Sequence, residues 1–202
     1  MELEGWIEWH VSTRTHPGEA VCGDAWLALQ RPAGLLLAVV DGLGHGEGAA
    51  EAARVACDVL RESSEGPLDV LVTRCHAALR GTRGVALTLA LVRRAGRLDW
   101  LGVGNVEAVI ARASGANAAR VESLMLQPGI VGYALPTLRP AEIDFSPGDM
   151  LVMATDGVRS SFLEALSARE DPSSMAPQLL ARYGKQTDDA LVLAATCLRG
   201  GA

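Results

Sequence analysis

The chain has 202 residues, of which 49% are hydrophobic and 21% are charged, and its formal net charge is −6. This composition is typical of a globular protein with a hydrophobic core, and the length suggests that residues 1–202 form a single domain. The acidic balance excludes a nucleic-acid-binding protein, which normally carries a basic surface. The start of the chain is too acidic for a signal peptide, and no apolar run is long enough to span a bilayer, so we expect a cytoplasmic protein without a membrane partner.

The first part of the chain predicts three strands followed by two helices. Alternating residues predict strands over 6–12 and 24–30, and the apolar run 35–40 is typical of a strand buried on both faces. This run ends at Asp41, and a glycine-rich segment follows over 42–48. Apolar residues at helical spacing then predict a helix over 49–61, and a second helix over 67–79 begins near Pro67.

The remainder of the chain is richer in strands. It predicts strands over 85–93, 98–103, 106–112 and 120–125, a strand over 149–155, helices over 160–168 and 174–183, and a last strand over 190–197. Strands therefore occur in groups with paired helices between the groups, whereas a doubly wound parallel sheet would alternate strand and helix regularly. We predict an α+β fold in which antiparallel sheets and helices form layers.

Four aspartates fall at the ends of apolar strands. Asp41 and Asp156 each end a strand and precede a glycine, whereas Asp24 and Asp188 stand at or just before the start of other strands. One such residue is usually a turn or a cap. Four of them predict a shared cleft if the strands are neighbours, and carboxylates that close together repel one another unless cations lie between them. Oxygen ligands favour Mg²⁺ or Mn²⁺ over Zn²⁺, so we predict a site for divalent cations.

The motifs around these acids resemble those of a known family. In chain order they are Gly23-Asp24, Val39-Val40-Asp41-Gly42 with Gly44-His45-Gly46, Thr155-Asp156-Gly157, and Asp188-Asp189. Together they are similar to the metal-dependent protein phosphatases, and most similar to the bacterial stress and sporulation branch with its small stressosome phosphatases. The resemblance implies an α-β-β-α sandwich of two antiparallel sheets flanked by helix pairs. It also implies metal ions at one edge between the sheets.

The resemblance implies a role for each acid. Asp41 would bridge two Mn²⁺ or Mg²⁺ ions, and the carbonyl of Gly42 would bind one of them. Asp156 and Asp188 would bind the other ion. Asp24 would bind directly or through a water molecule.

The implied reaction is hydrolysis of phosphoserine or phosphothreonine on a protein by a metal-activated water, without a phosphoenzyme. In the family the first acid of the last pair is the ligand, so we prefer Asp188 to Asp189. His45 would either donate a proton to the leaving oxygen or orient the glycine-rich loop. The implied partners are phosphorylated stressosome scaffold proteins in a stress-response pathway, and a monomer is favoured.

Two positions depart from the family pattern. Related animal enzymes hold a third ion with an aspartate where this chain has Asn105, so we do not expect a third ion. Their phosphate-binding arginine has no clear counterpart, since Arg14 is the only arginine before Asp24. Phosphate would then be held by the metal ions alone.

Other functions are compatible with parts of the sequence. Residues 44–49 satisfy the dinucleotide pattern G-x-G-x-x-A, but Asp41 and Glu47 would repel a pyrophosphate and no lysine or arginine is expected nearby. If its acids support no turnover, the chain would instead be a regulator that binds a phosphoprotein. A further alternative is hydrolysis of a small phosphorylated metabolite, and an enzyme of that kind requires a deep basic pocket. The histidines at 10, 16, 45 and 76 show no metal-ligand spacing, so we expect them to be ordinary surface or packed residues.

Overall fold

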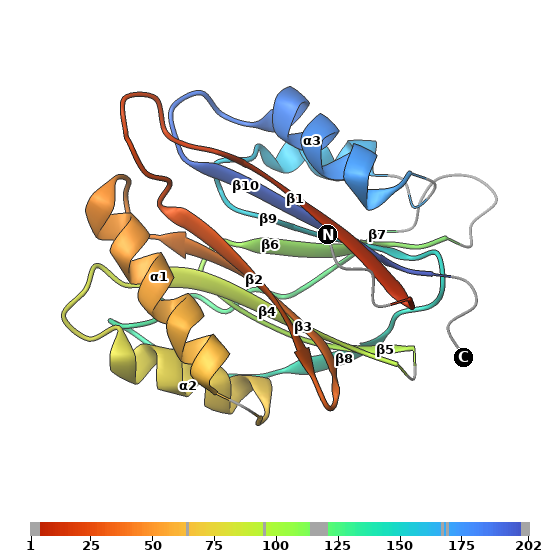
Figure 1. Ribbon diagram of the computed structural model, residues 1–202, viewed down its shortest axis with the longest axis horizontal. Coiled ribbons are helices and arrows are strands. Elements are labelled where there is room, and N and C mark those ends of the chain that lie inside the picture. The colour runs from red at the N-terminus through yellow and green to blue at the C-terminus, as the bar shows by residue number, and fades with distance from the viewer. Residues whose placement is uncertain are drawn as a thin grey trace.

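The computed structural model describes residues 5–63, 65–94, 96–113, 121–166, 168 and 170–198. Within them the chain forms two five-stranded antiparallel sheets with helices on their outer faces (Figure 1). The strand order is β1-β10-β9-β6-β7 in the first sheet and β2-β3-β4-β5-β8 in the second. The elements are β1 (Ile7–Arg14), β2 (Asp24–Arg31), β3 (Gly34–Gly42), α1 (Glu47–Glu62), α2 (Leu68–Ala78), β4 (Val85–Arg93), β5 (Arg97–Val103), β6 (Glu107–Ala111), β7 (Val121–Ser123), β8 (Ala141–Asp144), β9 (Met150–Ala154), the 3₁₀ segment η1 (Ser160–Ala165), α3 (Pro172–Tyr183) and β10 (Ala190–Cys197).

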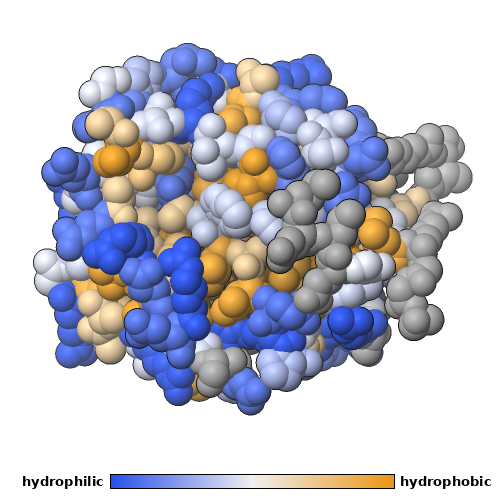
Figure 2. Space-filling view, in the orientation of Figure 1, coloured by the Kyte–Doolittle hydropathy of each residue, from blue (hydrophilic) through white to orange (hydrophobic). Residues whose placement is uncertain are grey.

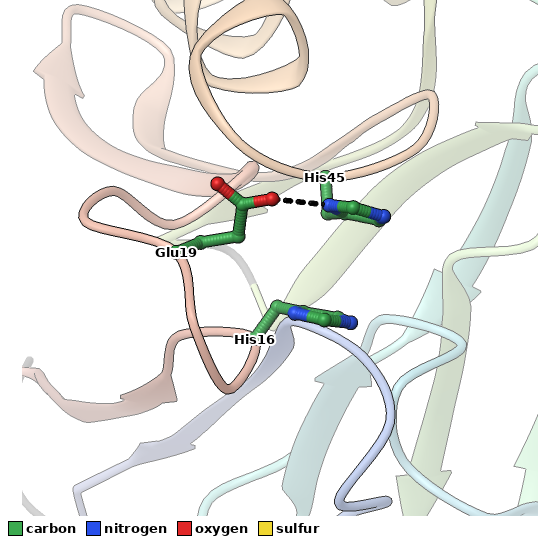
Figure 3. Close-up of side chains that lie close together, drawn as sticks. All are labelled: His16, Glu19 and His45. Atoms are coloured by element: carbon green, nitrogen blue, oxygen red, sulfur yellow. Dashed lines mark hydrogen bonds and ion pairs between the residues drawn. The ribbon is translucent and has the colours of Figure 1, made fainter.

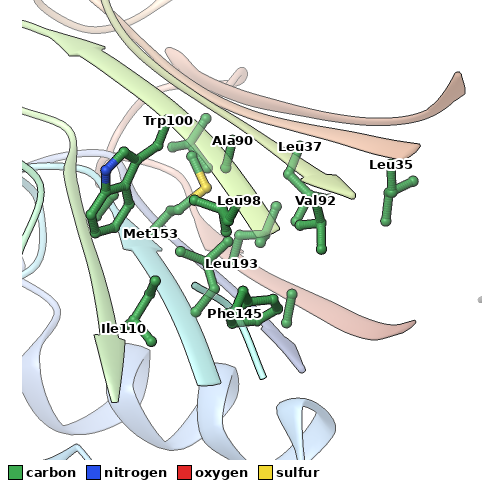
Figure 4. Close-up of a cluster of buried hydrophobic side chains, with 14 of the residues drawn as sticks. Leu35, Leu37, Ala90, Val92, Leu98, Trp100, Ile110, Phe145, Met153 and Leu193 are labelled. Carbon is green, nitrogen blue, oxygen red and sulfur yellow. The ribbon is translucent and has the colours of Figure 1, made fainter. Parts of the chain in front are cut away.

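The two sheets pack face to face over a shared hydrophobic core. Leu37 and Val92 of the second sheet point into this layer (Figure 4). Ile110, Met153 and Leu193 of the first sheet enter the same cluster, and all five side chains are fully buried. Complete burial of one such side chain contributes about 1.5–3 kcal/mol, so this layer sets the spacing of the sheets. It thereby also fixes the edge at which strand ends from both sheets meet.

Helices cover the outer face of each sheet. The buried face of α1 consists largely of alanines, including Ala49, Ala53 and Ala56, which let the helix lie close to β2 and β3. On the other side α3 packs against β1 and β10 through residues such as Met175 and Leu179. Figure 2 shows that hydrophilic residues cover most of one face of the molecule, with hydrophobic residues visible in a band between the helix layers. In the described ranges no helix combines the length and hydropathy needed to cross a membrane.

Most elements agree with the sequence prediction, and the predicted α+β class is confirmed. The strand expected to be buried on both faces is β3, in which every residue except Asp41 is buried. The short edge strand β8 has no sequence prediction, because its residues are largely exposed and show no hydrophobic period. The helix predicted over 160–168 is instead the six-residue 3₁₀ segment η1, with Phe162 as its buried residue. The prediction for residue 120 lies outside the described residues.

Candidate metal centre

Strand ends from both sheets bring the predicted aspartates to one edge of the sandwich. In the second sheet Asp24, the first residue of β2, pairs directly with Asp41 in β3. In the first sheet Asp156 follows β9 and Asp188 precedes β10, and these two strands are neighbours. A cavity of about 180 Å³ at this edge is lined by Asp41, Leu43, Gly44, Asn105, Asp156 and Asp188.

Asp24 is the most buried of the four aspartates and does not line this cavity. Its side chain is only 8% exposed, and its Oδ2 accepts a 2.7 Å hydrogen bond from the Thr155 hydroxyl. Burial raises the pKa of Asp24 to about 7, with smaller contributions from Asp189, Asp156 and Asp188, while the Thr155 hydrogen bond opposes the rise. Asp24 is therefore set back from the cavity and held by a neutral donor.

Asp41 and Asp156 at the cavity also carry raised pKa values. Burial raises the pKa of Asp41 to about 8, and neighbouring carboxylates, Asp24 first among them, add to the rise. Burial likewise raises the pKa of Asp156, with a further contribution from Asp188 that Lys185 partly offsets. A cation among these groups would remove both the burial and the repulsion penalties, and oxygen donors suit Mg²⁺ or Mn²⁺. This donor set therefore fits the predicted divalent cations.

The glycines that follow Asp41 and Asp156 are required by close backbone contacts. A Cβ at Gly42 would lie 2.2 Å from the carbonyl oxygen of Ala49 in α1. A Cβ at Gly157 would lie 1.7 Å from the carbonyl oxygen of Asp189. Each Asp-Gly pair thus allows the acid to sit where two backbone segments cross, which explains why the glycine follows the acid in both places.

The two acids of the Asp188-Asp189 pair have different surroundings. Asp189 is 3% exposed, and its carboxylate accepts hydrogen bonds from the backbone N–H groups of His16 at 2.8 Å and Gly23 at 2.9 Å. It therefore holds the segment that leads into Asp24. Asp188 lines the cavity and accepts a hydrogen bond from the N–H of Asp189. This arrangement favours Asp188 over Asp189 as the ligand.

Three further polar residues contribute to the site. Asn105, considered in the sequence only as a departure from the family pattern, donates a 2.7 Å hydrogen bond from Nδ2 to Asp156 Oδ2. Thr155 contacts Asp24, and Lys185 acts electrostatically on Asp156. In the sequence Thr155 appears only as part of the Thr155-Asp156-Gly157 motif, and no sequence pattern indicates Lys185. The position of Thr155 directly before Asp156 is the one signal that would have indicated it.

Two residues considered in the sequence do not line the cavity. His45 does not line it, and its Nδ1 lies 2.6 Å from Glu19 Oε1. Arg14 donates a hydrogen bond from Nη2 to the backbone carbonyl of Lys185, which is a structural contact. These contacts support the loop-orienting role of His45, and its role as proton donor stays a prediction.

The glycine-rich loop does not have the setting of a dinucleotide site. The expectation that no basic residue lies near it is wrong, because Arg83 Nη1 donates a hydrogen bond to the His45 carbonyl at 3.2 Å. The strand before the loop, however, is β3, whose neighbours β2 and β4 are both antiparallel to it. The parallel βαβ unit that a dinucleotide fold requires is thus not formed at β3.

Comparisons with known proteins give the family of this chain. The family described as Stage II sporulation protein E (SpoIIE) matches residues 31–198. The phosphoserine phosphatase RsbX of Bacillus subtilis (strain 168) is 25% identical over 167 residues, which cover 78% of this chain and 80% of that protein. A crystal structure of RsbX in complex with magnesium has a TM-score of 0.85 and 19% identity, and the match covers 97% of this chain and 98% of that chain.

Two other solved structures extend the similarity. One, described as the bacterial stressosome, a modular system that has been adapted to control secondary messenger signalling, contains a chain that is 33% identical with a TM-score of 0.83, covering 94% of this chain and 98% of that one. The catalytic domain of the serine/threonine protein phosphatase PstP with two manganese ions has a TM-score of 0.75 and 17% identity, covering 96% and 99%. The predicted fold and the predicted class, a metal-dependent phosphatase, are confirmed, and the chain belongs to the stage II sporulation protein E (SpoIIE) family.

Proposed function

We propose that this chain removes phosphate from phosphoserine or phosphothreonine side chains of a partner protein. The observation that carries the proposal is the meeting of Asp41, Asp156 and Asp188 in one cavity at the edge between the sheets. The 25% identity with the phosphoserine phosphatase RsbX supports the same chemistry. We also propose that residues 1–202 act as one catalytic domain, because both sheets contribute acids to this edge.

The proposed ligands of two Mn²⁺ or Mg²⁺ ions are the four aspartates and one carbonyl. Asp41 would bridge the ions, the carbonyl of the following Gly42 would bind one of them, and Asp156 and Asp188, which line the same cavity as Asp41, would complete the set. Asp24, which is buried and set back, is better placed to act through a water molecule. When bound, the ions supply a water of low pKa and neutralise charge on the phosphoryl oxygens.

The chain's own residues hold these acids in position. Asn105 fixes one oxygen of Asp156 by its hydrogen bond and leaves the other oxygen for a ligand. Asp189 accepts a hydrogen bond from the N–H of Gly23 and thereby fixes the backbone directly before Asp24. Lys185 places a positive charge near Asp156 and lines the same hollow, where this charge would attract a phosphate. This charge adds to the expectation from the sequence, in which the metal ions alone would hold the phosphate.

An open hollow beside the acids suits a polypeptide substrate. It has a volume of about 570 Å³, and Asp156, Arg159, Ser160 and Lys185 are among its lining residues. The narrow cavity at the acids themselves, about 180 Å³, gives no deep basic pocket of the kind a small phosphorylated metabolite requires. RsbX and the stressosome chain are among the relatives, so we propose a phosphorylated stressosome component as the partner. A scaffold protein as the substrate and a cytoplasmic location stay predictions.

Phosphate release tests the proposal. The protein is incubated with a phosphoserine protein or with para-nitrophenyl phosphate, in the presence of EDTA, Mg²⁺ or Mn²⁺. We expect turnover of the phosphoprotein that depends on the cation and is lost in Asp156→Asn. The matched control is Asp171→Asn, because Asp171 is exposed, lies just before α3 and makes no side-chain cap.

The phosphoprotein-binding regulator is the alternative that this experiment separates. Absence of turnover with every cation, together with a stable complex between the chain and the phosphoprotein, would favour that alternative. Turnover that persists in EDTA or in Asp156→Asn would instead contradict the metal-dependent chemistry.

A further inference from the structure

A second group of metal-ligating side chains lies outside the carboxylate cluster. His16, Glu19 and His45 each offer a ligand atom, and these atoms all lie within 4.8 Å of one another. Figure 3 shows the two imidazole rings stacked, with one nitrogen of each on the side of Glu19. The ring centroids are 4.3 Å apart and the planes differ by 12°. The residues come from two loops, which is why spacing along the chain does not reveal the group.

Backbone contacts hold this group in place. The N–H of Glu19 donates to the carbonyl of His16 at 3.1 Å, so both residues belong to one turn. The N–H of His16 in turn donates to Asp189 Oδ1, which anchors the turn to the body of the domain. Gly46 leaves room on the opposite loop, because a Cβ there would lie 2.6 Å from Glu19 Oε2. The group therefore has a defined geometry rather than being a chance meeting of long exposed side chains.

The present hydrogen bonds leave ligand capacity unused. His45 Nδ1 lies 2.6 Å from Glu19 Oε1, and a metal ion would take the place of the proton between them. His16 Nδ1 is buried and has no hydrogen-bond partner in the described part of the chain. A buried polar atom without a partner costs free energy unless a ligand or water satisfies it.

We infer that His16, Glu19 and His45 form a binding site for a transition-metal ion of the Zn²⁺ class, separate from the oxygen-only carboxylate cluster. Two imidazoles and one carboxylate are a ligand set that Zn²⁺ uses with a fourth position left to water. The carboxylate cluster instead suits Mg²⁺ or Mn²⁺, so the two sites differ in the ion they select.

The surroundings permit such an ion. The site opens on a hollow of about 660 Å³ whose charged lining residues are Glu19, Glu47 and Arg83, so acidic side chains outnumber basic ones there. Bonds from Zn²⁺ to nitrogen and oxygen of about 2.0–2.2 Å place two ligand atoms of a tetrahedral ion roughly 3.3 Å apart. His45 Nδ1 and Glu19 Oε1, now 2.6 Å apart, must therefore separate slightly, whereas ligand atoms at the wider spacings, which reach up to 4.8 Å, must approach. His45 is half exposed, which leaves its ring free to turn toward the ion.

An ion at this site would join two segments that lead to the proposed catalytic acids. His16 and Glu19 precede Asp24 in the chain, and His45 follows Asp41. Binding would therefore tie the loop before β2 to the loop after β3 at the rim of the carboxylate cluster. This inference concerns a separate site and does not depend on the proposed phosphatase activity.

Zinc titration of the whole chain tests the inference. The protein is first saturated with Mg²⁺ in large excess, which occupies the carboxylate cluster, and Zn²⁺ is then added while heat release and bound zinc are measured. We expect one equivalent of zinc that magnesium does not displace, and shifts of the His16 and His45 ring signals in NMR spectra. Glu19→Gln, His16→Ala and His45→Ala should each weaken this binding by more than about 100-fold, since loss of an outer-shell partner alone costs about 10–100-fold.

Two matched controls define the result. Glu47→Gln removes an acid from the same hollow that is not among the three ligands, and His10→Gln removes a histidine of β1, so both should retain the zinc equivalent. Asp41→Asn should also retain it. The inference is overturned if zinc binding is unaffected by changes at the three residues, if it disappears in Asp41→Asn, or if magnesium displaces all of it.

Discussion

Asp24 and Asp41 are direct cross-strand partners in β2 and β3, at the end of the second sheet where Asp156 and Asp188 also meet. Like charges directly opposite each other on antiparallel strands destabilise a sheet. Burial raises the pKa of Asp24 to about 7, and burial together with repulsion from Asp24 raises the pKa of Asp41 to about 8. The free energy of unfolding of the metal-free protein is therefore lowered by these acids to an extent that depends on pH.

The stability of the metal-free protein should fall as the pH rises from about 4 to about 8. In this window the folded state binds more protons than the unfolded chain, because the folded pKa values of Asp24 and Asp41 are raised above 3.8. The expected loss is on the order of a few kcal/mol. Urea denaturation in EDTA at several pH values measures it. Saturating Mn²⁺ should flatten the decline, and a metal-free profile that rises through this window would contradict the assignment.

Asp41→Asn should abolish turnover and leave a folded protein. The amide keeps the size of the side chain but removes the negative charge of the proposed bridging ligand, so activity should fall by about 10³-fold or more. The same change relieves repulsion with Asp24, so the metal-free variant should unfold at higher urea than the wild type. Phosphate release and denaturation are measured on the same preparation. A variant that retains turnover would exclude the two-metal site.

Asp188→Asn and Asp189→Asn should impair different properties of the protein, metal binding in the first variant and stability in the second. Asp189 accepts two backbone N–H groups, and an amide leaves one of them without an acceptor, which costs about 1–3 kcal/mol. Asp189→Asn should therefore lower the free energy of unfolding. Asp188→Asn should instead weaken Mn²⁺ binding and turnover while the fold keeps its stability. Calorimetric Mn²⁺ titration and thermal unfolding of both variants decide which of the two acids is the ligand.

Asn105→Ala should act through Asp156. Loss of the Nδ2 donor removes a contribution that lowers the pKa of Asp156, so this pKa should rise further. We expect the acidic limb of the activity profile to move to higher pH and the Mn²⁺ affinity to fall by about 10–100-fold. Activity is measured across pH at several Mn²⁺ concentrations. An unchanged profile would show that the hydrogen bond does not orient Asp156.

Much of the fold and the main acids could be predicted from the sequence. Strands β4 and β10 were placed at their observed bounds, since long apolar runs between turn residues leave little choice. The four aspartates stood out because each falls where an apolar strand begins or ends, and two of them precede a glycine that close backbone contact requires. Local sequence therefore carries the signal for this site.

Contacts between distant loops were not predictable in the same way. The role of Asp189 depends on N–H groups of His16 and Gly23, which lie at the other end of the chain. The pairing of His16 with His45 depends on how two loops fold back over the sheet edge. The edge strand β8 was missed because its pairing with β5 rests on backbone hydrogen bonds and an exposed ion pair between Arg97 and Glu142, which leave no hydrophobic period.

The hydroxyl of Thr155 connects the two halves of the sandwich at the floor of the site. It accepts a hydrogen bond from the N–H of Leu191 in the first sheet and donates one to Asp24 in the second. Asp24 and Asp41 belong to one half and Asp156 and Asp188 to the other, so sliding of one sheet over its neighbour would separate the two pairs of acids. This small side chain therefore resists sliding of one sheet over the other. Thr155→Val should allow the distance between the two pairs of acids to vary while each sheet stays intact.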